Sequence, residues 1–268
     1  MAAIGALAAQ QAIPARGLTP AAVARYQVFA DAEQVARAAA EFMVARARQA
    51  LNRHGEFNLA LAGGRTPRRL YELLASPDYR GRIDWSRVWV YFTDERAVPP
   101  DHPDSNYGMI RAVLLDHVAV PAEQVARMEG EAGDLDAAAG RYARRLERLP
   151  RSIGNVPELD LVLLGLGTDG HTASLFPGSP VLDERERWVA AVDGPAGRRL
   201  TLTLPVLNHA RELMFLVTGG EKADIVRAVL GPGPGGRRCH PVQYLEPRGV
   251  VHWYLDAEAA RGLKGNAR

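Results

Sequence analysis

A short apolar run that stops at glycines is the feature that most restricts the fold of this 268-residue chain. Residues 161–164 carry no polar side chain, and the glycine-rich stretch 165–170 follows at once. A short apolar run bounded by turn residues is typical of a strand that is buried on both faces. Ligands of open α/β sheets lie beyond the carboxyl ends of such strands. Asp169 and His171 follow this run, so they are candidate functional residues.

Other apolar runs alternate with segments of helical periodicity. Strands are predicted over residues 26–29, 57–62, 88–92, 159–164, 188–192, 200–204, 213–217 and 250–255, and helices over residues 31–54, 106–115, 135–149 and 221–230. A further helix is predicted to open at Thr66, the expected N-cap, with Pro67 in its first turn. Strands separated by helices predict a three-layer α/β fold with a mainly parallel sheet. The crowded strands after residue 187 predict some antiparallel pairing toward the C-terminus.

The composition is ordinary for a globular protein, and a chain of this length can form one domain or two. We expect a single α/β domain over residues 21–262 and a flexible N-terminal extension over residues 1–20. The net charge of +2 gives no sign of a nucleic-acid or membrane partner, and no segment approaches the ~18 uninterrupted apolar residues of a membrane span. The single cysteine, Cys239, excludes an internal disulfide and a multi-thiolate metal site, which favours a reducing, cytoplasmic location.

The loop after the strand at 57–62 has the composition of an anion site. Gly63 and Gly64 let the backbone approach a ligand closely, and the helix that follows points its free N–H groups at that ligand. Phosphate suits this arrangement best. A plain tight turn with a helix cap explains the same residues.

The loop after the strand at 88–92 contains Asp94 and Arg96. A guanidinium such as Arg96 grips phosphate in a bidentate fashion, and Asp94 is suited to accept hydrogen bonds from sugar hydroxyls. The alternative is a surface ion cluster at the end of a strand. Asn106 follows in a segment that alternatively does no more than cap its helix.

The opening feature also matches a dinucleotide-binding pattern. Gly165, Gly167 and Gly170 fit G-x-G-x-x-G after a strand. A dinucleotide fold needs a long crossover helix after the third glycine, however, and Pro177 and Pro180 interrupt the chain there. We therefore expect no dinucleotide cofactor. A histidine in such a loop is often a satisfied polar residue, but the nearby Asp169 favours a functional site.

Two further cations are candidates for the same cleft. Lys222 lies in the first turn of a predicted helix, where a cation is unfavourable unless an anion offsets it. Arg199 opens a predicted strand and is placed to face the cleft. Simple solvent exposure explains both positions equally well.

Taken together, these loops resemble the 6-phosphogluconolactonase family. The likeness is carried by residues 63–67, 93–96, 104–109, 165–177 and 199–205, and it spans roughly residues 30–260. Both the order and the spacing of the segments agree with the family. This chain has Arg65 where the family usually has a serine, so the role of Arg65 is open.

The resemblance implies a Rossmann-like fold shared with glucosamine-6-phosphate deaminases and ribose-5-phosphate isomerases. It implies the hydrolysis of 6-phospho-D-glucono-1,5-lactone in the oxidative pentose phosphate pathway, with neither a metal nor another cofactor. His171 would be the general base, and Arg96 and Lys222 would hold phosphate. A phosphorylated sugar lactone is then the partner expected, and the protein is expected to be a monomer or a weak homodimer. The predicted site comprises His171, Asp169, Gly63, Gly64, Arg65, Thr66, Asp94, Arg96, Asn106, Gly170, Arg199 and Lys222.

The residues suit this chemistry on their own account. A lactone carbonyl is already electrophilic, so an imidazole that takes a proton from water is sufficient, and Asp169 is placed to orient it. One alternative is a deaminase-like aldose–ketose isomerase, but such relatives carry a glutamate shortly after the histidine, where this chain has Phe176. The other is a non-catalytic sugar-phosphate sensor, for whose DNA-binding output module the segment before residue 30 is too short.

Overall fold

The computed structural model describes residues 11–13, 24–150, 154–231 and 238–263. Its centre is a sheet with the strand order β1-β2-β10-β9-β6-β3-β4. Every pairing in this sheet is parallel except that between β1 and β2, so the prediction of a mainly parallel sheet is confirmed. The strands are β1 (Gln11–Ile13), β2 (Ala24–Phe29), β3 (Phe57–Leu61), β4 (Val88–Phe92), β6 (Leu161–Leu164), β9 (Glu212–Val217) and β10 (Val250–Asp256).

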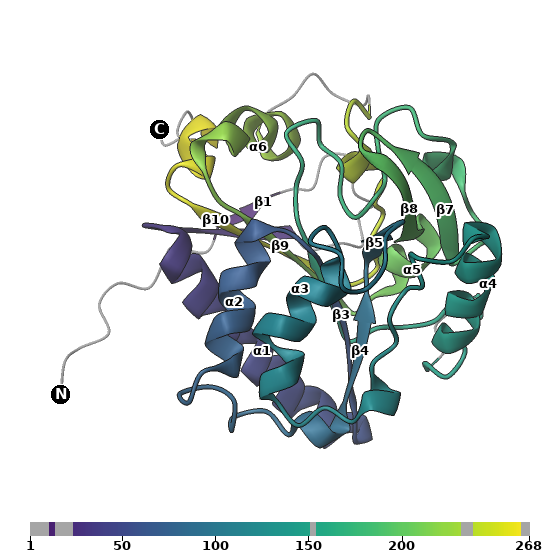
Figure 1. Ribbon diagram of the computed structural model, residues 1–268. Helices are drawn as coiled ribbons and strands as arrows, with labels where there is room; N and C mark the ends of the chain where they lie inside the picture. Colours follow the sequence, from purple (N-terminus) through teal and green to yellow (C-terminus); the bar gives the residue numbers. More distant parts are fainter. Residues whose placement is uncertain (1–10, 14–23, 151–153, 232–237, 264–268) are drawn as a thin grey trace.

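Helices cover both faces of this sheet, which gives three layers (Figure 1). One face packs against α1 (Ala32–His54), α2 (Arg65–Ala75) and α3 (Asn106–Val113). The other packs against α4 (Leu135–Leu146), α5 (Leu204–His209), α6 (Ala223–Leu230) and a small antiparallel sheet. That sheet has the order β5-β8-β7 and consists of β5 (Asp94–Arg96), β8 (Gly197–Leu202) and β7 (Val189–Gly194), which confirms antiparallel pairing toward the C-terminus.

Short 3₁₀ helices lie in the segments that connect these strands and helices. They are η1 (Trp85–Arg87), η2 (Leu115–His117), η3 (Ala122–Gln124), η4 (Pro180–Asp183), η5 (Gly220–Lys222), η6 (Pro241–Tyr244) and η7 (Ala259–Leu263). Of these, only η4 lies between β6 and β7. Between Gly170 and β7 the chain therefore carries no α-helix of the kind that a dinucleotide fold requires after its third glycine.

The sheet explains why the run at 161–164 is wholly apolar. Leu161 and Leu163 belong to the core beneath α1 and α2, whereas Val162 and Leu164 belong to the core on the opposite face. Successive side chains of a strand point to opposite faces, so a strand covered on both sides favours apolar residues at every position. Its carboxyl end is the first place where polar side chains reach solvent.

Helix ends agree with the sequence at α1 and differ at α2. The Asp31 side chain accepts a hydrogen bond from the Gln34 N–H at 2.8 Å, as predicted for the N-cap of α1. The prediction that Thr66 caps α2 was wrong, because α2 begins at Arg65 and its N-cap is Gly64, with φ +108°. Glycine alone adopts this backbone conformation readily, so the helix starts earlier than the threonine suggested. Thr66 instead shares a 3.0 Å hydrogen bond with the Thr218 hydroxyl.

Several boundaries also shift. The strand predicted over 200–204 is β8, which ends at Leu202 because α5 begins at Leu204 with Pro205 in its first turn. The helix predicted over 221–230 starts as a 3₁₀ turn, so Lys222 is the residue that precedes α6 rather than part of its first turn. Of the predicted N-terminal extension, only Gln11–Ile13 are described, and they pair with β2. The other residues of that extension lie outside the described residues, so the domain boundary stays a prediction. Among the described residues, no helix has the length and apolar composition that crossing a membrane would require.

Gly140 offers a test of the helix assignment. It is exposed in the middle of α4, and a Cβ added there meets no atom within 4 Å. Glycine inside a helix costs roughly 0.5–1 kcal/mol relative to alanine. We expect Gly140→Ala to raise the free energy of unfolding by about that amount in urea denaturation. An unchanged or lower value would contradict the α4 assignment.

Candidate active site

A cavity of about 240 Å³ lies where four strands of the large sheet end. Most of its lining comes from the ends of β3, β4, β6 and β9 and the segments that follow them, and Arg199 is added from β8. The four strands are neighbours in the order β9-β6-β3-β4. From β3 the chain passes to β4 on one side and later returns to β6 on the other side. Such a reversal of strand order opens a crevice at the carboxyl ends of the strands, which is where open α/β sheets bind ligands.

His171 lines this cavity from the loop after β6. Its ring Nδ1 lies 2.6 Å from Asp169 Oδ1, and the same carboxylate oxygen accepts the His171 backbone N–H at 3.0 Å. Burial by itself would raise the pKa of Asp169, but the hydrogen bonds from His171 hold it below its ordinary value. An ionised Asp169 accepts a hydrogen bond from Nδ1–H, which leaves Nε2 as the nitrogen free to accept a proton from a ligand.

The glycines of this loop fit the imidazole closely. The Gly167 N–H donates to the His171 carbonyl at 2.8 Å, and a Cβ on Gly167 would overlap the His171 ring. Gly170 has φ +84° and donates to the Gly167 carbonyl, so it shapes the turn. Phe176 packs against the imidazole with ring centroids 4.9 Å apart. Backbone and side-chain contacts therefore both fix the ring.

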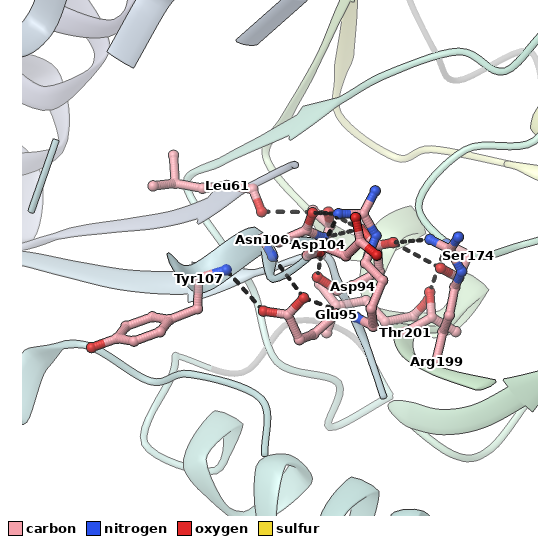
Figure 2. A network of polar contacts seen from close by, with 12 residues as sticks. Leu61, Asp94, Glu95, Asp104, Asn106, Tyr107, Ser174, Arg199 and Thr201 are labelled. Carbon is pink, nitrogen blue, oxygen red and sulfur yellow. Dashed lines mark hydrogen bonds and ion pairs between the residues drawn. The ribbon is translucent and has the colours of Figure 1, made fainter. Parts of the chain in front are cut away.

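A second group of polar residues joins β5 to the start of α3 (Figure 2). The prediction that Asp94 and Arg96 lie in a loop was wrong, because both belong to β5, which pairs with β8. Arg96 Nη1 donates to Asn106 Oδ1 at 2.6 Å and to the Asp104 carbonyl at 2.7 Å. The Asn106 amide in turn donates to the Asp94 carbonyl at 2.9 Å. Arg96 and Asn106 are thereby held on the wall of the cavity. Arg96 Nε is buried with no hydrogen-bond partner among the described residues, so the guanidinium keeps an unused donor.

Glu95 links β5 to the start of α3 by hydrogen bonds. Its carboxylate accepts the backbone N–H groups of Arg96, Asn106 and Tyr107, each at 2.8 Å, and the Ser105 hydroxyl at 3.0 Å (Figure 2). Burial raises the pKa of Glu95, and these hydrogen bonds oppose the rise. The carboxylate satisfies free N–H groups at the first turn of α3, so its role is to position its neighbours.

Arg199 and Asp94 lie beside this group, because β8 pairs with β5 and Arg199 is the cross-strand partner of Arg96. Arg199, on β8, lies 4.0 Å from Asp94 Oδ2, and only 15% of its side chain is exposed. The same carboxylate oxygen accepts the Ser174 hydroxyl at 2.7 Å. Burial lowers the pKa of Arg199, and the charge of Asp94 opposes the decrease. Arg199 therefore faces the cleft rather than solvent, which decides between the two interpretations of its position.

The loop after β3 forms the remaining wall. Gly63, Gly64, Arg65 and Thr66 all line the cavity at the start of α2, and Lys222 lines it from η5. Burial lowers the pKa of Lys222, while the charges of nearby acidic side chains oppose this effect and that of Arg65 adds to it. Four cationic side chains (Arg65, Arg96, Arg199 and Lys222) thus line the cavity against two carboxylates (Asp94 and Glu221). The balance favours an anionic ligand.

Ten of the twelve predicted site residues line this one cavity, and the exceptions are Asp169 and Gly170. Asp169 contacts the ligand-facing imidazole, and Gly170 shapes its turn. Three residues of the site were not predicted from the sequence: Thr172 and Thr218, which line the cavity, and Ser174, which donates a hydrogen bond to Asp94. Thr172 Oγ1 is buried with no partner among the described residues. In the sequence, Thr172 and Ser174 are marked only by their closeness to His171, and Thr218 only by its position after a predicted strand.

Gly63 provides a test of the geometry. A Cβ at this position would overlap the amide of Asn106, which holds Arg96. We expect Gly63→Ala to displace Asn106 and to destabilise the fold by about 1–3 kcal/mol, as overpacking typically does. The measurement is the free energy of unfolding, with Gly81→Ala as the control because a Cβ there meets nothing within 4 Å. Equal stability of the two variants would contradict the described contact.

No three His, Cys, Asp or Glu side chains converge on a possible metal position within the described ranges. A metal-independent reaction stays a prediction that this observation alone does not test.

Comparison with known proteins places the chain in a family. The model of the family glucosamine-6-phosphate isomerases/6-phosphogluconolactonase matches residues 30–253. The 6-phosphogluconolactonase of Rattus norvegicus is 38% identical over 258 residues, which cover 94% of this chain and 96% of the relative. That of a Synechocystis strain is 37% identical over 220 residues, 82% of this chain and 90% of the relative.

A solved structure agrees with these matches. The 6-phosphogluconolactonase of Trypanosoma brucei superposes with a TM-score of 0.78 at 32% identity, covering 89% of this chain and 98% of that one. The match in sequence extends over the same strands and loops that build the cavity. The chain therefore belongs to the family of glucosamine-6-phosphate isomerases and 6-phosphogluconolactonases.

Proposed function

We propose that this protein hydrolyses 6-phospho-D-glucono-1,5-lactone to 6-phospho-D-gluconate. The observation that carries the proposal is the imidazole of His171, which is held by Asp169 and faces the same small cavity as four cationic side chains. An imidazole suits proton transfer from water, and the cations suit a phosphate dianion. The names of the rat, Synechocystis and Trypanosoma brucei relatives support the same activity.

The reaction begins at the phosphate end of the substrate. Arg96, Arg199 and Lys222, together with the free N–H groups at the start of α2, hold the phosphate. Binding energy from this remote group fixes the lactone carbonyl carbon, C1, against His171. Such positioning makes the attack of water effectively unimolecular.

The chemical step needs one base. His171 Nε2 takes a proton from a water molecule as the water oxygen bonds to C1, and the carbonyl electrons move to oxygen. Asp169 stabilises the imidazolium that forms. Collapse of the tetrahedral intermediate breaks the bond between C1 and the ring oxygen, and the imidazolium returns its proton to that oxygen. The product is the open-chain acid, and His171 is again neutral.

An aldose–ketose isomerase would need a second group that transfers protons, and the resemblance places that group, a glutamate, where this chain has Phe176. Phe176, the residue in question, packs against the imidazole and cannot move a proton. This contact supports hydrolysis over aldose–ketose isomerisation. We also propose a cytoplasmic location and a monomer or weak homodimer, as the sequence analysis expected.

An assay of ester opening tests the proposal. Freshly generated 6-phosphogluconolactone is given to the full chain, and acid release is corrected for spontaneous hydrolysis. We expect strong acceleration with this substrate, much less with unphosphorylated gluconolactone, and no ammonia from glucosamine 6-phosphate. The absence of acceleration would overturn the proposal, and ammonia release would replace it with the deaminase reaction.

A further inference from the structure

A second cavity lies at the opposite end of the large sheet and is larger than the candidate active site. Its volume is about 870 Å³. Residues of β9, β10 and β2 line it together with the stretch of α1 from Phe42 to Arg53. Strand β9 connects the two cavities, because Glu212 at its start lines this one and Val217 at its end lines the other. A rise of 3.3 Å per residue separates these two positions by roughly 17 Å.

The register of β2 and β10 places several of the lining side chains on the same face of the large sheet. Arg25 on β2 pairs with His252 on β10, and Gln27 pairs with Tyr254. Residues paired across parallel strands, and residues two apart along a strand, share a face of the sheet. Tyr254 belongs to the core beneath α1, so this face is the α1 side. Phe42 of α1 lines the cavity on the same side, and its ring centroid lies 4.5 Å from that of His252.

The charge of this cavity is strongly unbalanced. Five arginines line it (Arg25, Arg46, Arg53, Arg211 and Arg248), whereas its acidic side chains are Glu158 and Glu212. Both acids are already engaged. Glu158 forms an ion pair with Arg211, and Glu212 lies 3.1 Å from Arg46 and 2.7 Å from His252 Nε2.

Three cations are left without a carboxylate. Arg25, Arg53 and Arg248 have no ion pair in the part of the chain that the structure describes. They come from β2, α1 and the segment before β10, so they approach the cavity from three different elements. All three side chains are exposed and line the same cavity without a carboxylate partner, so they give it a positive potential that a bound anion would complement. Burial raises the pKa of Tyr254 to about 12, so its hydroxyl remains a neutral donor at the same place.

We propose that this cavity binds a small molecule that carries two or more phosphate groups. Guanidinium groups match phosphate oxygens in bidentate geometry. A single phosphate is far too small to reach three arginines spread around a space of this size, so the ligand needs at least two anionic groups. The inference goes beyond the proposed function and does not depend on it, because none of these residues lines the candidate active site.

Binding of inorganic pyrophosphate to the full chain, measured by isothermal titration calorimetry, tests the proposal. We compare wild type with Arg25→Gln/Arg53→Gln and with the control Arg48→Gln/Arg80→Gln. The control removes the same charge from exposed positions outside the cavity, one of them on the same helix as Arg53. The Arg96→Ala variant serves as a second background, in which the active-site anion position is weakened. ADP and orthophosphate are titrated in parallel to separate an organic diphosphate from free phosphate.

We expect wild type and Arg96→Ala to bind one pyrophosphate, Arg25→Gln/Arg53→Gln to weaken that binding about tenfold or more, and the control to change it less than about twofold. Binding should fall as salt rises, and orthophosphate should bind more weakly than pyrophosphate. Tighter binding of ADP than of pyrophosphate would identify an organic diphosphate as the ligand. Three results would each overturn the proposal: no binding to wild type, equal weakening in the control, or loss of binding in Arg96→Ala.

Discussion

Replacing His171 by alanine should lower kcat by about 10² to 10⁴-fold and leave the affinity for 6-phosphogluconate nearly unchanged. A positioned general base contributes a factor of this size, equivalent to roughly 3–5 kcal/mol of barrier. The cationic side chains that we propose to hold phosphate lie on other loops, so removal of the imidazole leaves them in place. Steady-state kinetics with the phosphorylated lactone and product binding by calorimetry give the two quantities.

His117→Ala is the matched control, because this imidazole lies outside the cavity and contacts the Ala112 carbonyl. It should keep the wild-type kcat. Turnover of His171→Ala close to that of wild type would remove His171 from the mechanism. A Kd for 6-phosphogluconate that rises as much as kcat falls would mean that the variant disturbs binding instead.

Replacing Arg96 by alanine should act mainly on binding. Truncating one partner of a desolvated charge pair costs about 2–5 kcal/mol, so we expect KM to rise by a factor of about 30 or more. Asn106 also loses its 2.6 Å contact with Arg96 Nη1, which loosens the wall of the cavity. The proposed base is untouched, so kcat should fall much less than KM rises.

The same kinetic comparison includes Arg144→Ala, a change of an exposed arginine on α4 that lies outside the cavity. Its kcat and KM should match those of wild type. An unchanged KM for Arg96→Ala, or a loss confined to kcat, would exclude an anchoring role for this guanidinium.

Much of the fold could be predicted because its signals are local. The apolar run at 161–164 is decided by burial on both faces, and the cap at Asp31 is decided within one turn of helix. The site loops were found for a related reason, since the turn residues that end a strand also mark where ligands bind. The resemblance to a family added the chemistry that these loops carry.

The missed features depend on contacts between residues far apart in the chain. Thr66 does not cap α2 as predicted, and its hydroxyl instead shares a hydrogen bond with Thr218, 152 positions away. Ser174 reaches Asp94 across 80 positions. The cavity at the other end of the sheet joins residues of α1, β2, β9 and β10, and nothing in those segments alone indicates that their arginines line one cavity. Periodicity and turn residues report only on neighbours along the chain, so contacts between distant residues can be identified only from the three-dimensional structure.

A structure of the full chain in complex with 6-phosphogluconate tests the central claim most directly. We expect the phosphate within hydrogen-bonding distance of Arg96 and Lys222, at the start of α2. We also expect the carboxyl carbon C1 near His171 Nε2, either in contact or with one water molecule between them. A phosphate bound beside His171, or a C1 separated from the imidazole by more than one water molecule, would contradict it.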